Sequence, residues 1–223
     1  RGVTRIAIQQ AEFGHAGDAA RRGLESAPAD VGLQTYNIAV RYRDGIINQD
    51  DDSRRAAAND ARDLRDRTGG TRLLAGIIID DYIRDGRDLE ALDEIAAALE
   101  FDANNLALYQ VNLEILLRRG EFERVETELR RMLVRFPENN NVKESLIRYY
   151  ISRGELDEAE SFLREQIVEG EPADATRVTL VRFLAEGRNR DAARAELENL
   201  IQEGTNTPLF RSMRATMNYE DGF

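Results

Sequence analysis

The 223-residue chain contains no cysteine and only one histidine. Without cysteine it forms no disulfide, binds no metal through a thiolate and has no cysteine nucleophile. The histidine, His15, stands in the turn-like sequence Gly14–Gly17, and one histidine alone does not make a zinc site. We interpret it as an exposed turn residue. We expect no metal, no cofactor and no catalytic residues, so the chain is predicted not to be an enzyme.

Positive charge is also scarce. Lysine and arginine number 31 against 42 aspartates and glutamates, a formal net charge of −11. Nucleic acids and anionic membranes both require a basic surface, so neither is an expected partner. No stretch of the chain is long and apolar enough to cross a bilayer, and the apolar run Gly76–Ile79 ends at Asp80 and Asp81. Lys143 is the only lysine among the 31 lysine and arginine residues, and this preference for arginine indicates a GC-rich, bacterial genome. The composition is compatible with either the cytoplasm or the periplasm.

What the chain does contain is an internal repeat. Gly86, Gly120, Gly154 and Gly222 fall at multiples of 34 residues. Three apolar columns keep the same spacing, and the first holds small residues: Ala57, Ala91, Val125, Ala159 and Ala193. The other two are Ile95, Leu129, Leu163 and Leu197, and Leu99, Leu133, Ile167 and Ile201. One period shared by so many columns predicts a repeat architecture.

The apolar spacing predicts two helices in the clearest unit. One face of the first helix is expected to carry Tyr109, Leu113, Leu116 and Leu117. Gly120 ends that helix, because glycine adopts a left-handed backbone at little cost. The second helix is predicted over 121–136, before Pro137, and its inner face is formed by Val125, Leu129, Met132 and Leu133. The column of small residues marks where the two helices approach most closely.

This pair of antiparallel helices resembles the tetratricopeptide repeat. The residues that carry the resemblance are Tyr109, Leu113, Gly120, Phe122, Val125, Leu129, Met132 and Pro137. The next unit has Lys143 where the family has an aromatic residue, and the unit after it is one residue short before its turn at Gly187. The resemblance implies an all-α fold, a right-handed α-solenoid of helix-turn-helix repeats, in a protein that binds other proteins.

We predict about six units in two parts. Residues 1–67 hold degenerate helix pairs, with helices expected over 1–13, from Asp18 to Pro28, over 31–49 and over 54–67. The candidate linker is Thr68–Thr71. Residues 72–223 form the regular array, and its last unit is truncated at Phe223, so we expect the chain to be part of a longer protein.

Three polar or aromatic clusters have alternative interpretations. Asp50–Asp52 lacks the alternating acids, central glycine and terminal glutamate of a calcium loop, and capping of a helix start explains it better. Asp80 and Asp81 are neighbours on a helix, so we expect one to face the groove and the other to face solvent. The pair Tyr149–Tyr150 is interpreted as core packing.

Stacked repeats of this family place the first helix of each unit along an inner groove. By the resemblance, Gly76, Ser152 and Val178 face this groove. The candidate partner-binding residues are Asp80, Arg84, Gln110, Glu114, Arg118, Asn141, Glu144, Arg148 and Arg182. The structural alternative is ion pairing between units, such as Glu114 with Arg148 or Glu144 with Arg182. Lys143 alone does not reproduce the family's carboxylate clamp, so binding of chaperone tails is not supported.

The leading hypothesis is a non-enzymatic scaffold or adaptor that binds a protein or peptide partner in the groove and has no small-molecule substrate. One alternative is a structural spacer in a bacterial envelope or polysaccharide-export assembly, which a signal sequence upstream of Arg1 would favour. Another is the regulatory region of a larger enzyme, which a catalytic domain beyond Phe223 would reveal.

Overall fold

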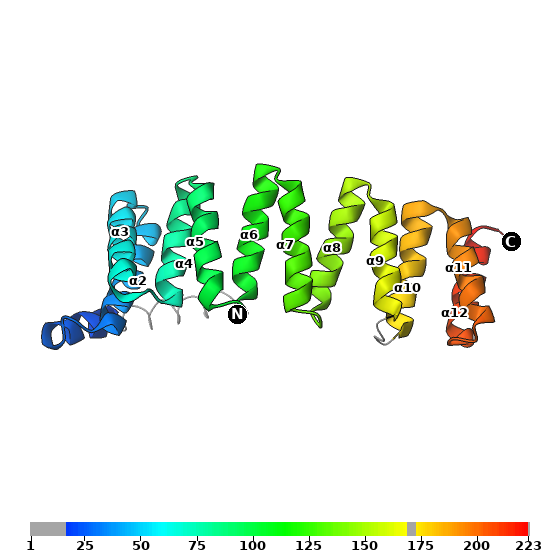
Figure 1. Ribbon diagram of the computed structural model, residues 1–223, viewed down its shortest axis with the longest axis horizontal. Coiled ribbons are helices and arrows are strands. Elements are labelled where there is room, and N and C mark those ends of the chain that lie inside the picture. The colour runs from blue at the N-terminus through cyan, green and yellow to red at the C-terminus, as the bar shows by residue number, and fades with distance from the viewer. Residues whose placement is uncertain (1–16, 169–172, 223) are drawn as a thin grey trace. The chain divides into compact units, whose positions relative to one another are not determined.

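The computed structural model describes residues 17–168 and 173–222, and every regular element in them is helical (Figure 1). Residues 17–26, at the start of the described part of the chain, are helical. The elements that follow are α2 (Val31–Ile47), α3 (Asp51–Thr68), α4 (Arg72–Arg84), α5 (Asp88–Phe101), α6 (Leu106–Arg119), α7 (Phe122–Arg135), α8 (Asn140–Arg153), α9 (Leu156–Val168), α10 (Ala173–Phe183), η1 (Leu184–Arg188), α11 (Arg190–Gln202) and α12 (Thr207–Glu220). The predicted all-α fold class is confirmed. The helix expected over 1–13 and His15 lie outside the described residues.

The chain divides into two compact units, Arg1–Phe122 and Glu123–Phe223. In the first, each helix from α2 to α6 packs against the next, and α2 also contacts α4. In the second, contacts run in the same way from α8 to α12. We call α2, α4, α6, α8, α10 and α12 the A helices, and α3, α5, α7, α9 and α11 the B helices. None of the described helices combines the length and the apolar character needed to cross a bilayer.

The boundary of the predicted parts falls inside the first unit. Gly69 ends α3 in the left-handed conformation, and the Thr71 side chain caps α4 by accepting a hydrogen bond from the Leu74 amide. The segment Thr68–Thr71 is therefore the turn between two helices that pack on each other. The division into 1–67 and 72–223 rests on repeat regularity and stays a prediction.

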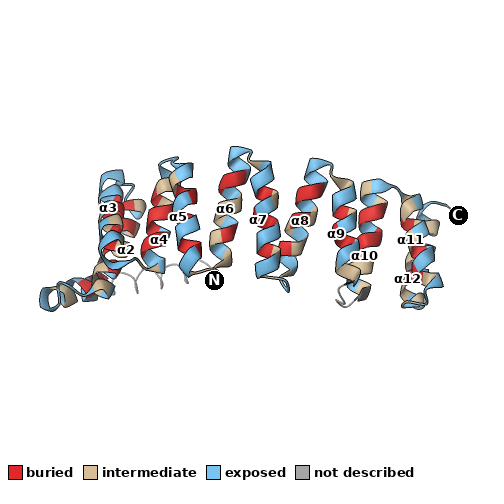
Figure 2. Ribbon diagram, in the orientation of Figure 1, coloured by how far each residue is buried: buried red, intermediate tan, exposed pale blue. Residues whose placement is uncertain are grey.

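The core follows the 34-residue columns. The small-residue column is at most 1% exposed throughout, and the column from Ile95 to Leu197 is at most 3% exposed. Leu99 is buried in the third column, whereas Leu133, Ile167 and Ile201 are half-buried. Figure 2 shows the result, with buried patches recurring on successive helices and exposed residues between them. The small-residue column is thus the most uniformly buried position of the repeat, as expected where two helices approach closely.

The predicted helix ends are mostly confirmed. Gly120 and Gly154 end their helices with φ of 72° and 73°, a backbone region that favours glycine. The Asp50 carboxylate accepts a hydrogen bond from the Ser53 amide at 3.0 Å, which is the expected N-cap. The helix it caps, α3, begins at Asp51, three residues before the predicted start at Arg54.

The turn predicted at Gly187 was wrong. Instead of ending at a left-handed glycine, the helix widens into the π turn η1, in which the Asn189 amide bonds to the Leu184 carbonyl at 2.9 Å. The Asn189 side chain then caps α11 by accepting from the Ala192 amide. Ala193 keeps its place in the buried column.

The inner face of α6 also differs from the prediction. Leu117 is 51% exposed, and Ile115 is buried in its place at 1% exposure. Tyr109 and Leu116 are buried as predicted, and Leu113 is half-buried. Near its C-terminal end, α6 therefore turns an apolar residue outward, at the position equivalent to the exposed Ile151 of α8.

Candidate functional site

The nine candidate partner-binding residues lie on four A helices. Asp80 and Arg84 are on α4, and Gln110, Glu114 and Arg118 are on α6. In the second unit, Asn141, Glu144 and Arg148 are on α8, and Arg182 is on α10. Asp80 is half-buried, and the other eight are exposed. We call this exposed side of the A helices the A-helix wall, and describe it separately in each unit.

In the first unit, the wall combines paired and unpaired groups. Asp80 accepts hydrogen bonds from the Tyr42 hydroxyl at 2.7 Å and from Arg84 Nε at 2.6 Å, both at Oδ2. Arg118 binds the Asp88 carboxylate of α5 at 2.5 Å, so part of its role is to join α6 to the preceding helix. Gln110 and Glu114 make no side-chain hydrogen bond with any described residue. These two side chains are therefore the ones most accessible to a partner.

In the second unit, the wall is less paired. Arg148 Nη2 donates only a long hydrogen bond, 3.3 Å, to the Ser145 hydroxyl on its own helix. Glu144 and Arg182, both within the described part of the chain, make no ion pair with each other. The ion pair that the structural alternative required inside this unit is therefore not formed, and both groups remain exposed.

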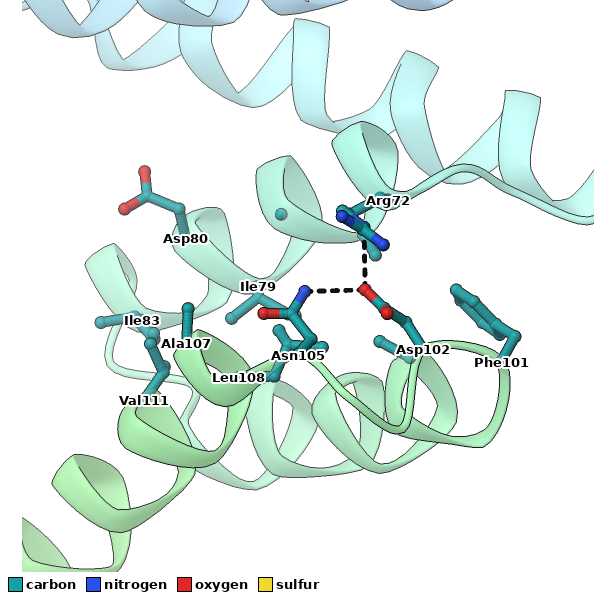
Figure 3. Close-up of a pocket in the computed structure, with 13 residues that line it drawn as sticks. Arg72, Ile79, Asp80, Ile83, Phe101, Asp102, Asn105, Ala107, Leu108 and Val111 are labelled. Atoms are coloured by element: carbon teal, nitrogen blue, oxygen red, sulfur yellow. Dashed lines mark hydrogen bonds and ion pairs between the residues drawn. The ribbon is translucent and has the colours of Figure 1, made fainter. Parts of the chain in front are cut away.

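A cavity of about 300 Å³ opens in the wall of the first unit, between α4, α5 and α6 (Figure 3). Its walls are mostly apolar, and its lining includes Ala75, Gly76, Ile79, Ile83, Ala98, Phe101, Ala107, Leu108 and Val111. The ring of Phe101 is 63% exposed and stands at the edge. We call this space the α4–α6 cavity. An apolar cavity with a few polar groups is the usual form of a ligand-binding site.

Polar groups occupy the rim of the α4–α6 cavity. The Asp102 carboxylate forms an ion pair with Arg72, 2.8 Å from Nε, and accepts a hydrogen bond from the Asn105 amide group, also at 2.8 Å. Figure 3 shows Arg72 and Asn105 both directed at Asp102, while Asp80 stands apart from this group. The Arg72 side chain is 76% exposed, so it closes one end of the cavity only loosely.

An equivalent cavity, of about 260 Å³, opens in the second unit between α8, α9 and α10. Its lining matches that of the first cavity at a shift of 68 residues, or two repeats. Gly76 corresponds to Glu144, Ile79 to Ile147 and Val111 to Thr179. The lining of this α8–α10 cavity is more polar, because it includes Lys143, Glu144, Gln166, Thr176 and Thr179. The repeat therefore provides the same space twice with different chemistry.

Sequence reasoning placed Gly76, Asp80 and Glu144 on the wall but missed the apolar lining. In the sequence, Ile79, Leu108 and Val111 could not be distinguished from core residues. Hydrophobic spacing predicts which side of a helix is apolar, but it does not predict whether another helix covers that side. The missed signal was Gly76 itself, a glycine inside a helix where nothing in the sequence required a turn.

We expected one of Asp80 and Asp81 to face the groove and the other to face solvent. This prediction is wrong for Asp81, which is buried. Its side chain is 4% exposed and forms ion pairs with Arg54 and Arg62 of α3. Arg54 is itself 3% exposed and also donates to Asp85 Oδ1 at 2.7 Å. A hydrogen bond from Arg55 to Asp85 lowers the pKa of that carboxyl group. This cluster holds α3 against α4, and we assign it a structural role.

A comparable polar cluster joins α7 to α8 in the second unit. The Tyr150 hydroxyl accepts from Arg130 Nη2 at 2.6 Å and donates to Glu126 Oε1 at 2.9 Å. Burial and the hydrogen bond to Glu126 raise the pKa of Tyr150 to about 12. Tyr150 is fully buried and Tyr149 is 8% exposed, which confirms that the tyrosine pair packs in the core.

Metal ligands do not gather in the described part of the chain, where no group of three or more histidine, cysteine, aspartate or glutamate side chains is placed to hold an ion. Asp50 caps α3, and Asp51 contacts Arg54. The wall thus offers shape, apolar surface and isolated charges, which suit recognition of a polypeptide.

Comparison with solved structures identifies the class of fold as that of tetratricopeptide-repeat proteins. A tetratricopeptide repeat protein from Parabacteroides merdae superposes with a TM-score of 0.50 at 18% identity, covering 85% of this chain and 74% of that one. PilF from Pseudomonas aeruginosa gives a TM-score of 0.55 at 12% identity, covering 94% and 92%. YrrB, described as a tetratricopeptide-repeat protein with an unusual peptide-binding site, gives 0.50 at 15% identity, covering 89% and 99%.

By sequence, the chain matches no family model and no curated protein. The predicted resemblance to the tetratricopeptide repeat is therefore confirmed as a likeness of fold.

Proposed function

We propose that the chain is a non-enzymatic protein-interaction scaffold that holds a protein or peptide partner on its A-helix wall. The observation that carries the proposal is the cavity that recurs in this wall at the same repeat positions in both units. Exposed charged and polar side chains border each cavity, as is usual for sites that anchor a side chain and orient the segment around it. YrrB has the same fold and is described as binding peptide, which supports the proposal.

The wall residues named above supply orientation in this proposal. On α6, Glu114 presents hydrogen-bond acceptors, and Gln110 presents both a donor and an acceptor. In the second unit, Arg148 and Arg182 present cations. An exposed arginine can bind a carboxylate through two parallel hydrogen bonds. The mixed charge of the wall favours a partner held by several separate contacts, not one cluster of a single sign.

A random peptide library displayed on phage and selected on the immobilised chain tests the proposal. The wall variant is Gln110→Arg/Glu114→Arg, and the matched control is Ala56→Arg/Asp63→Arg on exposed positions of α3, with the same change in net charge. Peptides that bind the native chain and the control but lose at least tenfold in affinity on the wall variant support the proposal. Failure to enrich any peptide, or equal binding to both variants, contradicts it.

A further inference from the structure

Gly76 is an unusual residue for its position. It lies inside α4, and glycine inside a helix is destabilising relative to alanine. Packing does not require it, because a Cβ added at Gly76 would meet no atom within 4 Å. Its backbone is ordinary helix, so no positive φ demands a glycine either. The chain therefore keeps a destabilising residue at a site where a side chain would fit.

The repeat shows what the missing side chain does. At the 34-residue spacing, the equivalents of Gly76 are Tyr42, Gln110, Glu144 and Val178. Tyr42 is buried at 5% exposure, and so fills its place. Glu144 lines the α8–α10 cavity and makes it polar. Glycine at position 76 leaves the α4–α6 cavity without a polar side chain at this position, because the space that a side chain would take stays open.

The size of the α4–α6 cavity limits its occupant. About 300 Å³ is at the lower end of the range for small-molecule sites, which matches one large side chain and not a cofactor. Ile79, Leu108 and Val111 offer only apolar contact, so the occupant is an aliphatic or aromatic group. Backbone groups of a bound segment would then remain at the rim, near Asp80 and the pair formed by Arg72 and Asp102.

The charge of the first unit indicates what flanks the anchor. Residues 17–122 carry 14 arginines and no lysine against 21 aspartates and glutamates, a net charge of −7. At the rim, both hydrogen bonds to Asp80 are accepted by Oδ2, and Oδ1 accepts none from the described residues. A cationic group beside the anchor would therefore find one available carboxylate oxygen and an attractive field around it.

We propose that Gly76 holds the α4–α6 cavity open for one large apolar side chain of a cationic segment of a partner protein. This inference rests on the proposed function, and it adds the chemistry of the partner. The anchor enters between α4 and α6 against Ile79 and Val111, and an adjacent arginine or lysine pairs with Asp80. In the variant Gly76→Leu, the new side chain would occupy the cavity in place of the partner's anchor, and the rest of the wall would be unchanged.

Three synthetic pentapeptides test the proposal by titration into the isotope-labelled chain, followed by amide chemical shifts. The probe is acetyl-Gly-Arg-Phe-Arg-Gly-amide, and the comparison peptides replace both arginines by glutamate or the phenylalanine by serine. We expect saturable shifts at the amides of Gly76, Ile79 and Val111. The glutamate peptide should bind at least about threefold more weakly, and the serine peptide at least about tenfold more weakly.

The variants separate this proposal from a general loss of structure. Gly76→Leu should weaken the probe at least about tenfold, and Gly76→Ala less, because the smaller side chain fills less of the cavity. Leu89→Ala, at a position of α5 that is 55% exposed and does not line the cavity, should leave binding unchanged. Unchanged far-ultraviolet circular dichroism for each variant shows that the helices are intact.

Several results would overturn the proposal. Absence of saturable shifts, equal binding of the glutamate peptide, or full binding by Gly76→Leu each contradicts it. If Gly76→Leu instead changes the sedimentation coefficient of the chain, the cavity is covered by a second copy and the proposed occupant is wrong. Phage peptides that respond to the wall variant but not to Gly76→Leu would remove this inference and leave the proposed function standing.

Discussion

The buried ion pair between Arg54 and Asp81 supports a quantitative prediction about the first unit. Asp81 accepts ion pairs from two guanidinium groups, those of Arg54 and Arg62, and both partners in the Arg54–Asp81 pair are at most 4% exposed. Asp81→Ala removes the carboxylate and leaves Arg54 in the interior with only Asp85 and the exposed Asp51. Breaking such a pair from one side is destabilising, because the remaining charge stays buried without its main partner.

The expected loss is ~3 kcal/mol, the lower end of the range for breaking buried pairs, because Asp85 still compensates part of the Arg54 charge. The matched control is Asp60→Ala, on the neighbouring helix α3. Asp60 pairs with Arg41, and both side chains are nearly half exposed, 47% and 46%. Exposed pairs contribute at most ~1 kcal/mol, so the control should remain close to the native stability.

Hydrogen exchange followed by mass spectrometry measures this loss locally, which matters because a chain of two units need not unfold in one step. Amides of α3 and α4 should exchange about a hundredfold faster in Asp81→Ala, the factor equivalent to ~3 kcal/mol, while those of α11 keep their native rates. The double variant Arg54→Met/Asp81→Leu should return most of the protection, since it removes both charges. Equal exchange in Asp81→Ala and Asp60→Ala would refute the reasoning.

Three further predictions concern other parts of the fold. Ala159→Leu places a large side chain at a fully buried position of α9, which packs against α8; urea unfolding of the second unit should show a loss of ~1–3 kcal/mol, and an unchanged midpoint would contradict the packing described. Because the pKa of Tyr150 is raised to about 12, its contribution to stability is complete below pH ~10, the unfolded value, and is lost between pH ~10 and 12. The tyrosinate absorbance of the native chain minus that of Tyr150→Phe, measured against pH, should show a midpoint near the raised pKa, and a midpoint near pH ~10 would disprove the prediction. Gly76→Ala should stabilise the first unit by ~1 kcal/mol in hydrogen exchange of α4, because its Cβ meets nothing; a loss of stability would show that the glycine is structural after all.

The repeat columns explain why much of the fold was predictable. Ala91 and Ala159 are fully buried on α5 and α9, which pack against α4 and α8, and a close approach of two helices permits only small side chains, so their spacing in the sequence reports the packing directly. The same logic placed Gly120 and Gly154 at helix ends, where a positive φ restricts the residue type. Each of these positions accepts few residue types for a single physical reason, so its structural role can be predicted from the sequence.

The remaining features depend on contacts that a periodic pattern does not describe. Asp81 was expected to face either the groove or solvent, because its partner Arg54 lies 27 residues earlier on another helix. Gly187 appeared to end a helix, because a glycine near the expected turn does not distinguish a left-handed cap from a π turn. The apolar lining of the α4–α6 cavity appeared to be core, since the open space results from the absence of a side chain at Gly76.

Lys143, the only lysine of the chain, lines the α8–α10 cavity. An amine-reactive fluorophore can therefore attach at two kinds of group only, this side chain and the α-amino group. The α-amino group reacts first near pH ~8, because its ordinary pKa is about 2.5 units below that of a lysine, and can be blocked before the pH is raised. The native chain thus accepts an optical reporter beside one of its two wall cavities without any engineered cysteine, and a bound partner could be followed from that point.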